Sequence, residues 1–133
     1  MLSCFLNKYL KMETQTSDIE NRDDVKIFVN SFYEKVKTDP LLGPAFSHVD
    51  WVNHLPKMYN FWASLLLGDK SYNGTPLQHH LGLPIGNEHF DKWLLLFSET
   101  INENFSGDKA KEVKDRALAI AGVFQFKMGL LNR

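Results

Sequence analysis

The chain has 133 residues, of which 44% are hydrophobic, 13% aromatic and 23% charged. This length is typical of a single domain, and the apolar content excludes a disordered chain. A formal net charge of −1 gives no reason to expect binding to nucleic acid or to an anionic membrane. No run of about 18 apolar residues is present, so no membrane span is predicted. The single cysteine, Cys4, cannot form an internal disulfide, and we expect a cytoplasmic protein.

The first residues have no pattern that predicts a structural role. Residues 1–10 are apolar but lack the basic start, the long apolar core and the cleavage site of a signal peptide. We predict a disordered leader over residues 1–16 and a single domain over residues 17–133, with Met12 as an alternative start.

The first long helix is predicted from Arg22 to about Thr38, because apolar residues recur there at spacings of three and four. Asp39, which precedes Pro40, ends it. After a short helical turn within residues 41–46, Asp50 is expected to cap a second long helix that closes at Gly68. The apolar face of the first helix contains Val25, Phe28, Val29, Phe32, Tyr33 and Val36, and that of the second contains Trp51, His54, Leu55, Met58, Phe61, Trp62, Leu65 and Leu66.

Two more long helices and a short one are predicted in the second half. The short helix starts at Thr75-Pro76, places Leu77, His80 and Leu81 on one face, and ends at Pro84. Asn87 and Asp108 are the expected caps of the long helices, whose faces contain Phe90, Trp93, Leu94, Phe97 and Ile101, and then Val113, Ala117, Ile120, Ala121, Phe124, Met128 and Leu131. No segment alternates at period two, so the predicted fold class is all-α.

Histidines are the residues with the clearest chemical potential. Of the five, His54 and His80 lie on apolar helix faces, whereas His79 points about 100° away from His80. Two inward histidines in an apolar cavity suit one axial haem ligand and one residue over the opposite face. A zinc site needs more ligands and a di-iron site needs Glu-x-x-His pairs, so small-ion sites are disfavoured. A lone histidine on an apolar face is, however, more often a hydrogen-bonded core residue.

Tyr33, His54 and Trp93 combine an apolar body with a polar tip at positions that can face the same cavity. One interpretation of Tyr33 and Trp93 is core filling with the O–H and N–H groups satisfied inside the protein. The alternative is a cage of hydrogen-bond donors around iron-bound O₂, in which a donor to a polarised ligand contributes about 1.5–3 kcal/mol.

Several short motifs, in a fixed order and spacing, resemble group III of the bacterial truncated haemoglobins over about residues 18–131. They are Phe32-Tyr33-Glu34-Lys35-Val36, Leu42-Gly43-Pro44, Trp51 with His54, Asn60-Phe61-Trp62-Ala63, Leu66-Leu67-Gly68, Tyr72-Asn73-Gly74, Pro76-Leu77 with His80-Leu81 and Leu83-Pro84, and Phe90 with Trp93-Leu94 and Leu96-Phe97.

This resemblance implies a two-over-two helical sandwich around haem b, with His80 as the iron ligand. It implies distal roles for Tyr33, His54 and Trp93, with Met58 as an apolar neighbour. Further haem or core contacts would come from Phe32, Phe61, Trp62, Leu77 and Phe90, and propionate partners from Lys57, Lys70 or Tyr72. Pro56 departs from the expected pattern in the helix that contains His54.

The implied function is binding of O₂ and other small ligands such as NO, CO or peroxide, as in oxygen transport or in NO dioxygenase or peroxidase-like chemistry. The enzymatic roles need a separate reductant, because the chain contains no reductase domain. We expect a monomer with no nucleic-acid or membrane partner. The alternative is a non-enzymatic all-α module that senses a signal or carries haem.

Overall fold

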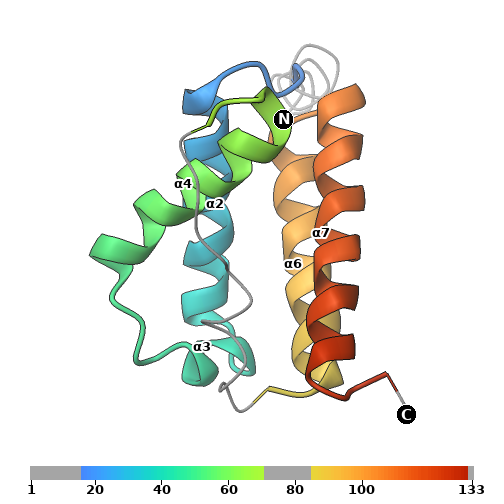
Figure 1. The fold of residues 1–133 in the computed structure, drawn as a ribbon. Helices are drawn as coiled ribbons and strands as arrows, with labels where there is room; N and C mark the ends of the chain where they lie inside the picture. Colours follow the sequence, from blue (N-terminus) through green and yellow to red (C-terminus); the bar gives the residue numbers. More distant parts are fainter. Residues whose placement is uncertain (1–15, 71–84, 132–133) are drawn as a thin grey trace, which may run out of the picture.

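The computed structural model describes residues 16–70 and 85–131, which fold into five helices (Figure 1). These helices are α2 (Arg22–Thr38), α3 (Leu42–Ala45), α4 (Trp51–Leu67), α6 (Asn87–Asn104) and α7 (Asp108–Lys127). No strand occurs in the described segments, and the all-α prediction is confirmed. The short helix expected from residue 75 lies outside the described residues.

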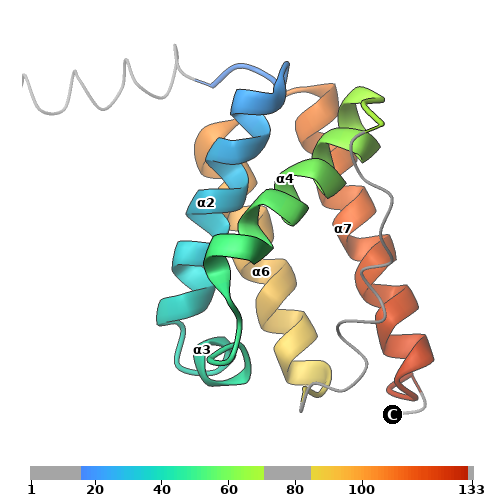
Figure 2. The same ribbon diagram turned by 60° about the vertical axis from the view of Figure 1, so that its left-hand side comes forward.

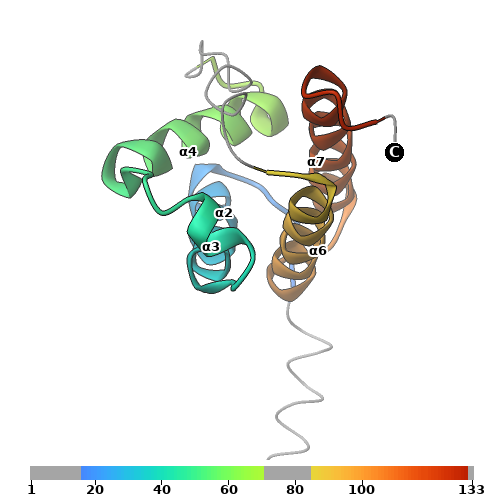
Figure 3. The same cartoon turned by 90° about the horizontal axis from the view of Figure 1, so that it is seen from below.

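The long helices form two layered pairs. Helix α2 packs against α4 and α6, and α6 packs against α7. Figure 2 shows α4 crossing α2 obliquely, and Figure 3 shows α2 and α4 on one side with α6 and α7 on the other. This arrangement is the predicted two-over-two sandwich. None of the described helices is long and apolar enough to span a bilayer.

Helix α2 begins and ends where its sequence predicts. The side chain of Asn21 accepts a hydrogen bond from the N–H of Asp24 at 3.0 Å, which satisfies one free donor of the first turn. At the other end, the buried carboxylate of Asp39 accepts hydrogen bonds from the N–H groups of Leu41 and Leu42, at 3.0 and 2.9 Å. Asp39 thus ends α2 and starts α3.

Helix α4 continues through Pro56, although proline lacks the N–H that would bond to the preceding turn. Asp50 is the N-cap residue as predicted, but its side chain accepts a hydrogen bond from the Asn53 amide at 2.6 Å and none from the first-turn backbone. Gly68 ends the helix in the left-handed conformation at φ 72°, which glycine adopts without a Cβ clash.

The predicted caps of α6 and α7 are wrong. Asn87 and Asp108 are the first residues inside their helices. Helix α7 is instead capped from a distance, because Asp18 accepts hydrogen bonds from the N–H groups of Lys109 and Ala110, both at 2.9 Å. Gly107 makes room for this contact, since a Cβ there would lie 2.6 Å from the carboxyl carbon of Asp18.

Aromatic rings at the centre join the two layers. Phe28 of α2 meets Trp62 of α4 and Phe97 of α6 edge to face, at centroid distances of 6.1 and 6.0 Å. Trp93 stacks on Phe97 at 5.3 Å and meets Phe32 edge to face at 5.2 Å. Such pairs add about 0.5–1.5 kcal/mol each beyond the burial of their area. The rings therefore fix the side chains that line the adjoining pocket.

Candidate functional site

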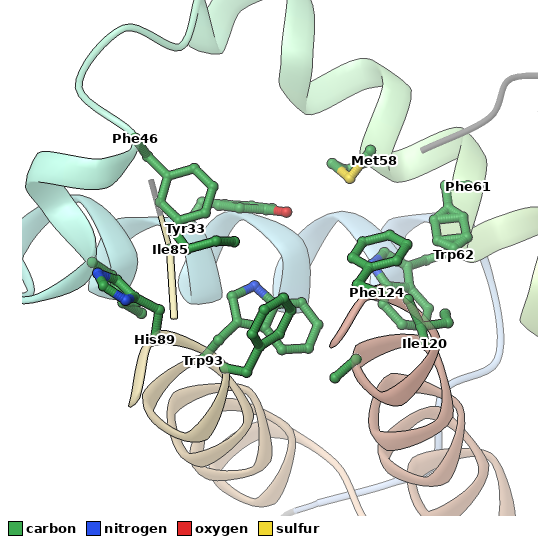
Figure 4. A pocket seen from close by; sticks show the side chains of 13 residues that line it. Tyr33, Phe46, Met58, Phe61, Trp62, Ile85, His89, Trp93, Ile120 and Phe124 are labelled. Atoms are coloured by element: carbon green, nitrogen blue, oxygen red, sulfur yellow. The ribbon is translucent and has the colours of Figure 1, made fainter. Parts of the chain in front are cut away.

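An apolar pocket lies between the two layers, near the ends of α2 and α7 and the start of α6 (Figure 4). Its empty volume is about 690 Å³, part of it open to solvent, which is in the range of small-molecule and cofactor sites. All four long helices contribute to its wall. The lining residues are Tyr33, Leu42, Phe46, Met58, Phe61, Trp62, Ile85, His89, Phe90, Trp93, Ile120, Ala121 and Phe124.

Tyr33 brings a buried hydroxyl to this wall. Its ring is held between Phe32 at 4.9 Å and Trp51 at 5.0 Å, and Figure 4 shows its oxygen directed into the cavity. Burial raises the pKa of the Tyr33 hydroxyl well above its usual range, so the group stays a neutral donor at physiological pH. No described residue is hydrogen-bonded to it, although buried polar groups normally have partners.

Trp93 adds a second polar group to the wall. Stacking on Phe97 and the edge of Phe32 fix its ring, and Figure 4 shows the indole nitrogen on the edge that faces the cavity. Within the described segments no acceptor is hydrogen-bonded to this N–H. Two donors thus converge on an otherwise apolar space, which is the usual composition of a site that orients a small ligand.

The other predicted site residues fall into three groups. Met58, Phe61, Trp62 and Phe90 line the pocket, whereas Phe32 lies behind Tyr33 and Trp93. His54 is half-buried and not part of the lining, and its imidazole meets Tyr33 at a centroid distance of 5.7 Å. Leu77, His80 and Tyr72 lie outside the described residues. The two lysines expected to bind the propionates, Lys57 and Lys70, are exposed.

His89 is a lining residue that the sequence reasoning missed. Its Nδ1 accepts a hydrogen bond from the N–H of Gly86 at 3.0 Å, which caps the start of α6. The signal in the sequence was the three-residue spacing between Gly86 and His89, which is the spacing of a capping box.

The described residues offer a wall for a flat apolar group but no cluster of metal ligands. No three His, Cys, Asp or Glu side chains come together within residues 16–70 and 85–131. The only described histidine in the lining, His89, already uses Nδ1 for the backbone. The apolar aromatic walls, and two donors that have no hydrogen-bond partner among the described residues, fit a haem with a small ligand. The iron ligand expected at His80 lies outside the described residues.

Comparison with known proteins decides the family. The family model described as bacterial-like globin matches residues 17–127. The group 3 truncated haemoglobin of Campylobacter jejuni is 39% identical over 112 residues, which cover 79% of this chain and 88% of that protein. This chain belongs to the truncated haemoglobin family. The predicted resemblance to its third group is confirmed.

Solved structures support the same conclusion. The crystal structure of a group III truncated haemoglobin from C. jejuni matches with a TM-score of 0.78 at 37% identity, over 86% of this chain and 95% of that one. The X-ray structure of a truncated oxygen-avid haemoglobin from Bacillus subtilis matches with a TM-score of 0.70 at 26% identity, over 78% of this chain and 92% of that one.

A second sequence relative is a group 1 truncated haemoglobin of Nostoc commune, which is 27% identical over 113 residues, or 84% of this chain and 96% of that protein.

Family membership gives this truncated haemoglobin a haem cofactor and the binding of small gaseous ligands such as O₂. When bound, haem supplies an iron centre for the ligand, and the chain supplies the environment. The wall is largely apolar, and Tyr33 and Trp93 hold two hydrogen-bond donors toward the pocket.

Proposed function

We propose that this protein retains O₂ and related diatomic ligands tightly, at haem b held by His80, and does not act as a freely exchanging oxygen carrier. The observation that supports the proposal is a pair of donors in an apolar pocket, Tyr33 and Trp93, that have no hydrogen-bond partner in residues 16–70 and 85–131. Each donor to a polarised ligand contributes about 1.5–3 kcal/mol, which corresponds to roughly ten- to hundred-fold slower release.

The reaction that we favour is conversion of NO or peroxide with electrons from a separate reductant. A ligand that leaves slowly is poorly suited to oxygen transport, but it remains in place long enough to react. We further propose that the protein works as a monomer in the cytoplasm, since its single cysteine, Cys4, fits a reducing compartment.

The cofactor and its ligand are tested by absorption spectra of the reduced protein with and without CO. Wild type and His79→Ala should show a haem band with a five-coordinate ferrous signature, and His80→Ala should lose that signature. His79→Ala is the matched control, because it removes the neighbouring imidazole. Loss of the signature in His79→Ala alone would place the iron ligand at residue 79, and no haem uptake by the folded wild type would overturn the proposed function.

The donor pair is tested by the rate of O₂ release after rapid mixing. Tyr33→Phe and Trp93→Phe each remove one N–H or O–H group and keep an aromatic ring. Each should release O₂ about ten-fold faster or more. Unchanged release in both variants would contradict tight retention by these donors and would favour a haem-carrying or sensory module.

A further inference from the structure

His54 has a position in α4 from which a second side-chain orientation would reach the pocket. Met58 follows it by four residues and lines the pocket. Side chains at positions i and i+4 lie on the same helix face, so rotation of the His54 side chain would bring its imidazole beside Met58. In this structure the imidazole instead lies against other rings outside the lining.

His54 is one of three rings in mutual contact. Trp51 meets His54 at a centroid distance of 5.6 Å, and Tyr33 meets them at 5.0 and 5.7 Å respectively. We call Tyr33, Trp51 and His54 the ring triad. Tyr33 is the member that lines the pocket, so it separates the pocket from the other two.

Lys37 holds Trp51 from another side. Its Nζ lies 4.9 Å from the centre of the Trp51 ring, within the range of a cation–π contact. The same Nζ lies 3.4 Å from Glu34 Oε1, which keeps the lysine side chain over the ring. Both residues belong to the last turns of α2, whereas Trp51 begins α4. The contact therefore joins the two helices next to the triad.

We propose that Trp51, braced by Lys37, is a positioning residue that keeps the His54 imidazole outside the ligand pocket. Only the consequence for a bound ligand rests on the proposed function; the position of His54 is a property of the chain itself. The ring contacts set the ratio of the two His54 orientations, and therefore how often a third donor joins Tyr33 and Trp93 in the pocket.

The position of His54 is measured first by NMR on the protein without haem, from nuclear Overhauser contacts between the imidazole protons and the Met58 methyl group. Trp51→Leu should make these contacts appear or strengthen, and Lys37→Met should strengthen them less, while Lys37→Arg leaves them as in wild type. Lys35→Met is the matched control, because Lys35 lies on the same helix but pairs with Glu103. His54–Met58 contacts that are the same in wild type and Trp51→Leu would overturn the proposal.

The consequence is measured in the haem-loaded protein from the infrared C–O stretch of bound carbon monoxide, whose bands report nearby hydrogen-bond donors. Trp51→Leu should raise the share of the band assigned to His54 in the pocket by roughly three- to ten-fold, as expected for the loss of aromatic contacts. Lys37→Met should raise it by roughly two-fold or more. The change should vanish in Trp51→Leu/His54→Leu.

A spectral change that persists in this double variant would overturn the proposal, because Trp51 would then act on the pocket without His54. A protein that takes up no haem would contradict the proposed function alone, since the NMR measurement still decides the position of His54.

Discussion

The two ends of the helical sandwich use polar side chains in opposite ways. At the end where α2 and α7 begin, Arg22 bonds Asn60 and pairs with Asp69 at 3.3 Å, and Lys109 donates to the carbonyl of Leu66 at 2.7 Å. We call this the closed end. At the pocket end, Tyr33 and Trp93 have no hydrogen-bond partner among the described residues. The closed end uses its polar groups to hold helices together, whereas the pocket end keeps donors available for a ligand.

Asp18 is the closed-end residue whose replacement should lower the free energy of unfolding most. Asp18→Ala removes both acceptors that cap α7, and we expect the free energy of unfolding to fall by about 2 kcal/mol. Urea denaturation at pH 7 measures this change. Asp108→Ala is the control, because Asp108 only adds charge to the first turn, and it should cost about 0.5 kcal/mol. Equal losses in the two variants would contradict a specific cap.

The two ends should respond to opposite extremes of pH. Burial acts to raise the pKa of Asp18, but hydrogen bonds from the Lys109, Ile19 and Ala110 N–H groups and the Lys109 charge outweigh it and lower the pKa. The unfolded chain therefore takes up a proton first, and stability falls as pH drops below about 4. This acid loss should be smaller in Asp18→Asn, as measured by urea midpoints from pH 6 to 2.

Tyr33 should make stability depend on pH in the opposite direction. Its raised pKa keeps the folded hydroxyl protonated where the unfolded chain ionises, so stability falls as pH rises above about 10. At pH 7, Tyr33→Phe should leave the free energy of unfolding unchanged or raise it by up to about 1 kcal/mol, because it removes a buried hydroxyl that no described residue bonds. In this variant, stability should also fall less as pH rises above about 10. A clear destabilisation at pH 7 would show that the hydroxyl is bonded within the chain.

The smallest effect is expected for an exposed ion pair near the closed end that joins two residues of the same helix. Lys111 and Asp115 approach to 3.7 Å on the exposed face of α7, with 81% and 67% of their side chains accessible. Lys111→Ala should change the free energy of unfolding by less than about 0.5 kcal/mol. This variant sets the background for the urea series. A larger loss of stability would mean that exposed ion pairs contribute as much as the hydrogen bonds and ion pairs of the closed end.

The sequence by itself determined the helices and most of the pocket wall. The three-four spacing identified α2 to within its observed bounds, and it placed Tyr33, Met58 and Trp93 on inward faces that do line the pocket. The pattern works because a helix of 3.6 residues per turn needs one apolar face to pack. The iron ligand expected at His80 remains a prediction, since it lies outside the described residues.

Only the tertiary structure decided which polar groups meet. Asp18 caps a helix that begins 90 residues later, and no local pattern in the sequence records such a pairing. His54 is on the expected face of α4, yet the crossing of α4 over α2 sets its imidazole beside Tyr33 of α2 rather than in the pocket. Periodicity fixes the direction of a side chain about its own helix axis, whereas its neighbours depend on how the helices cross.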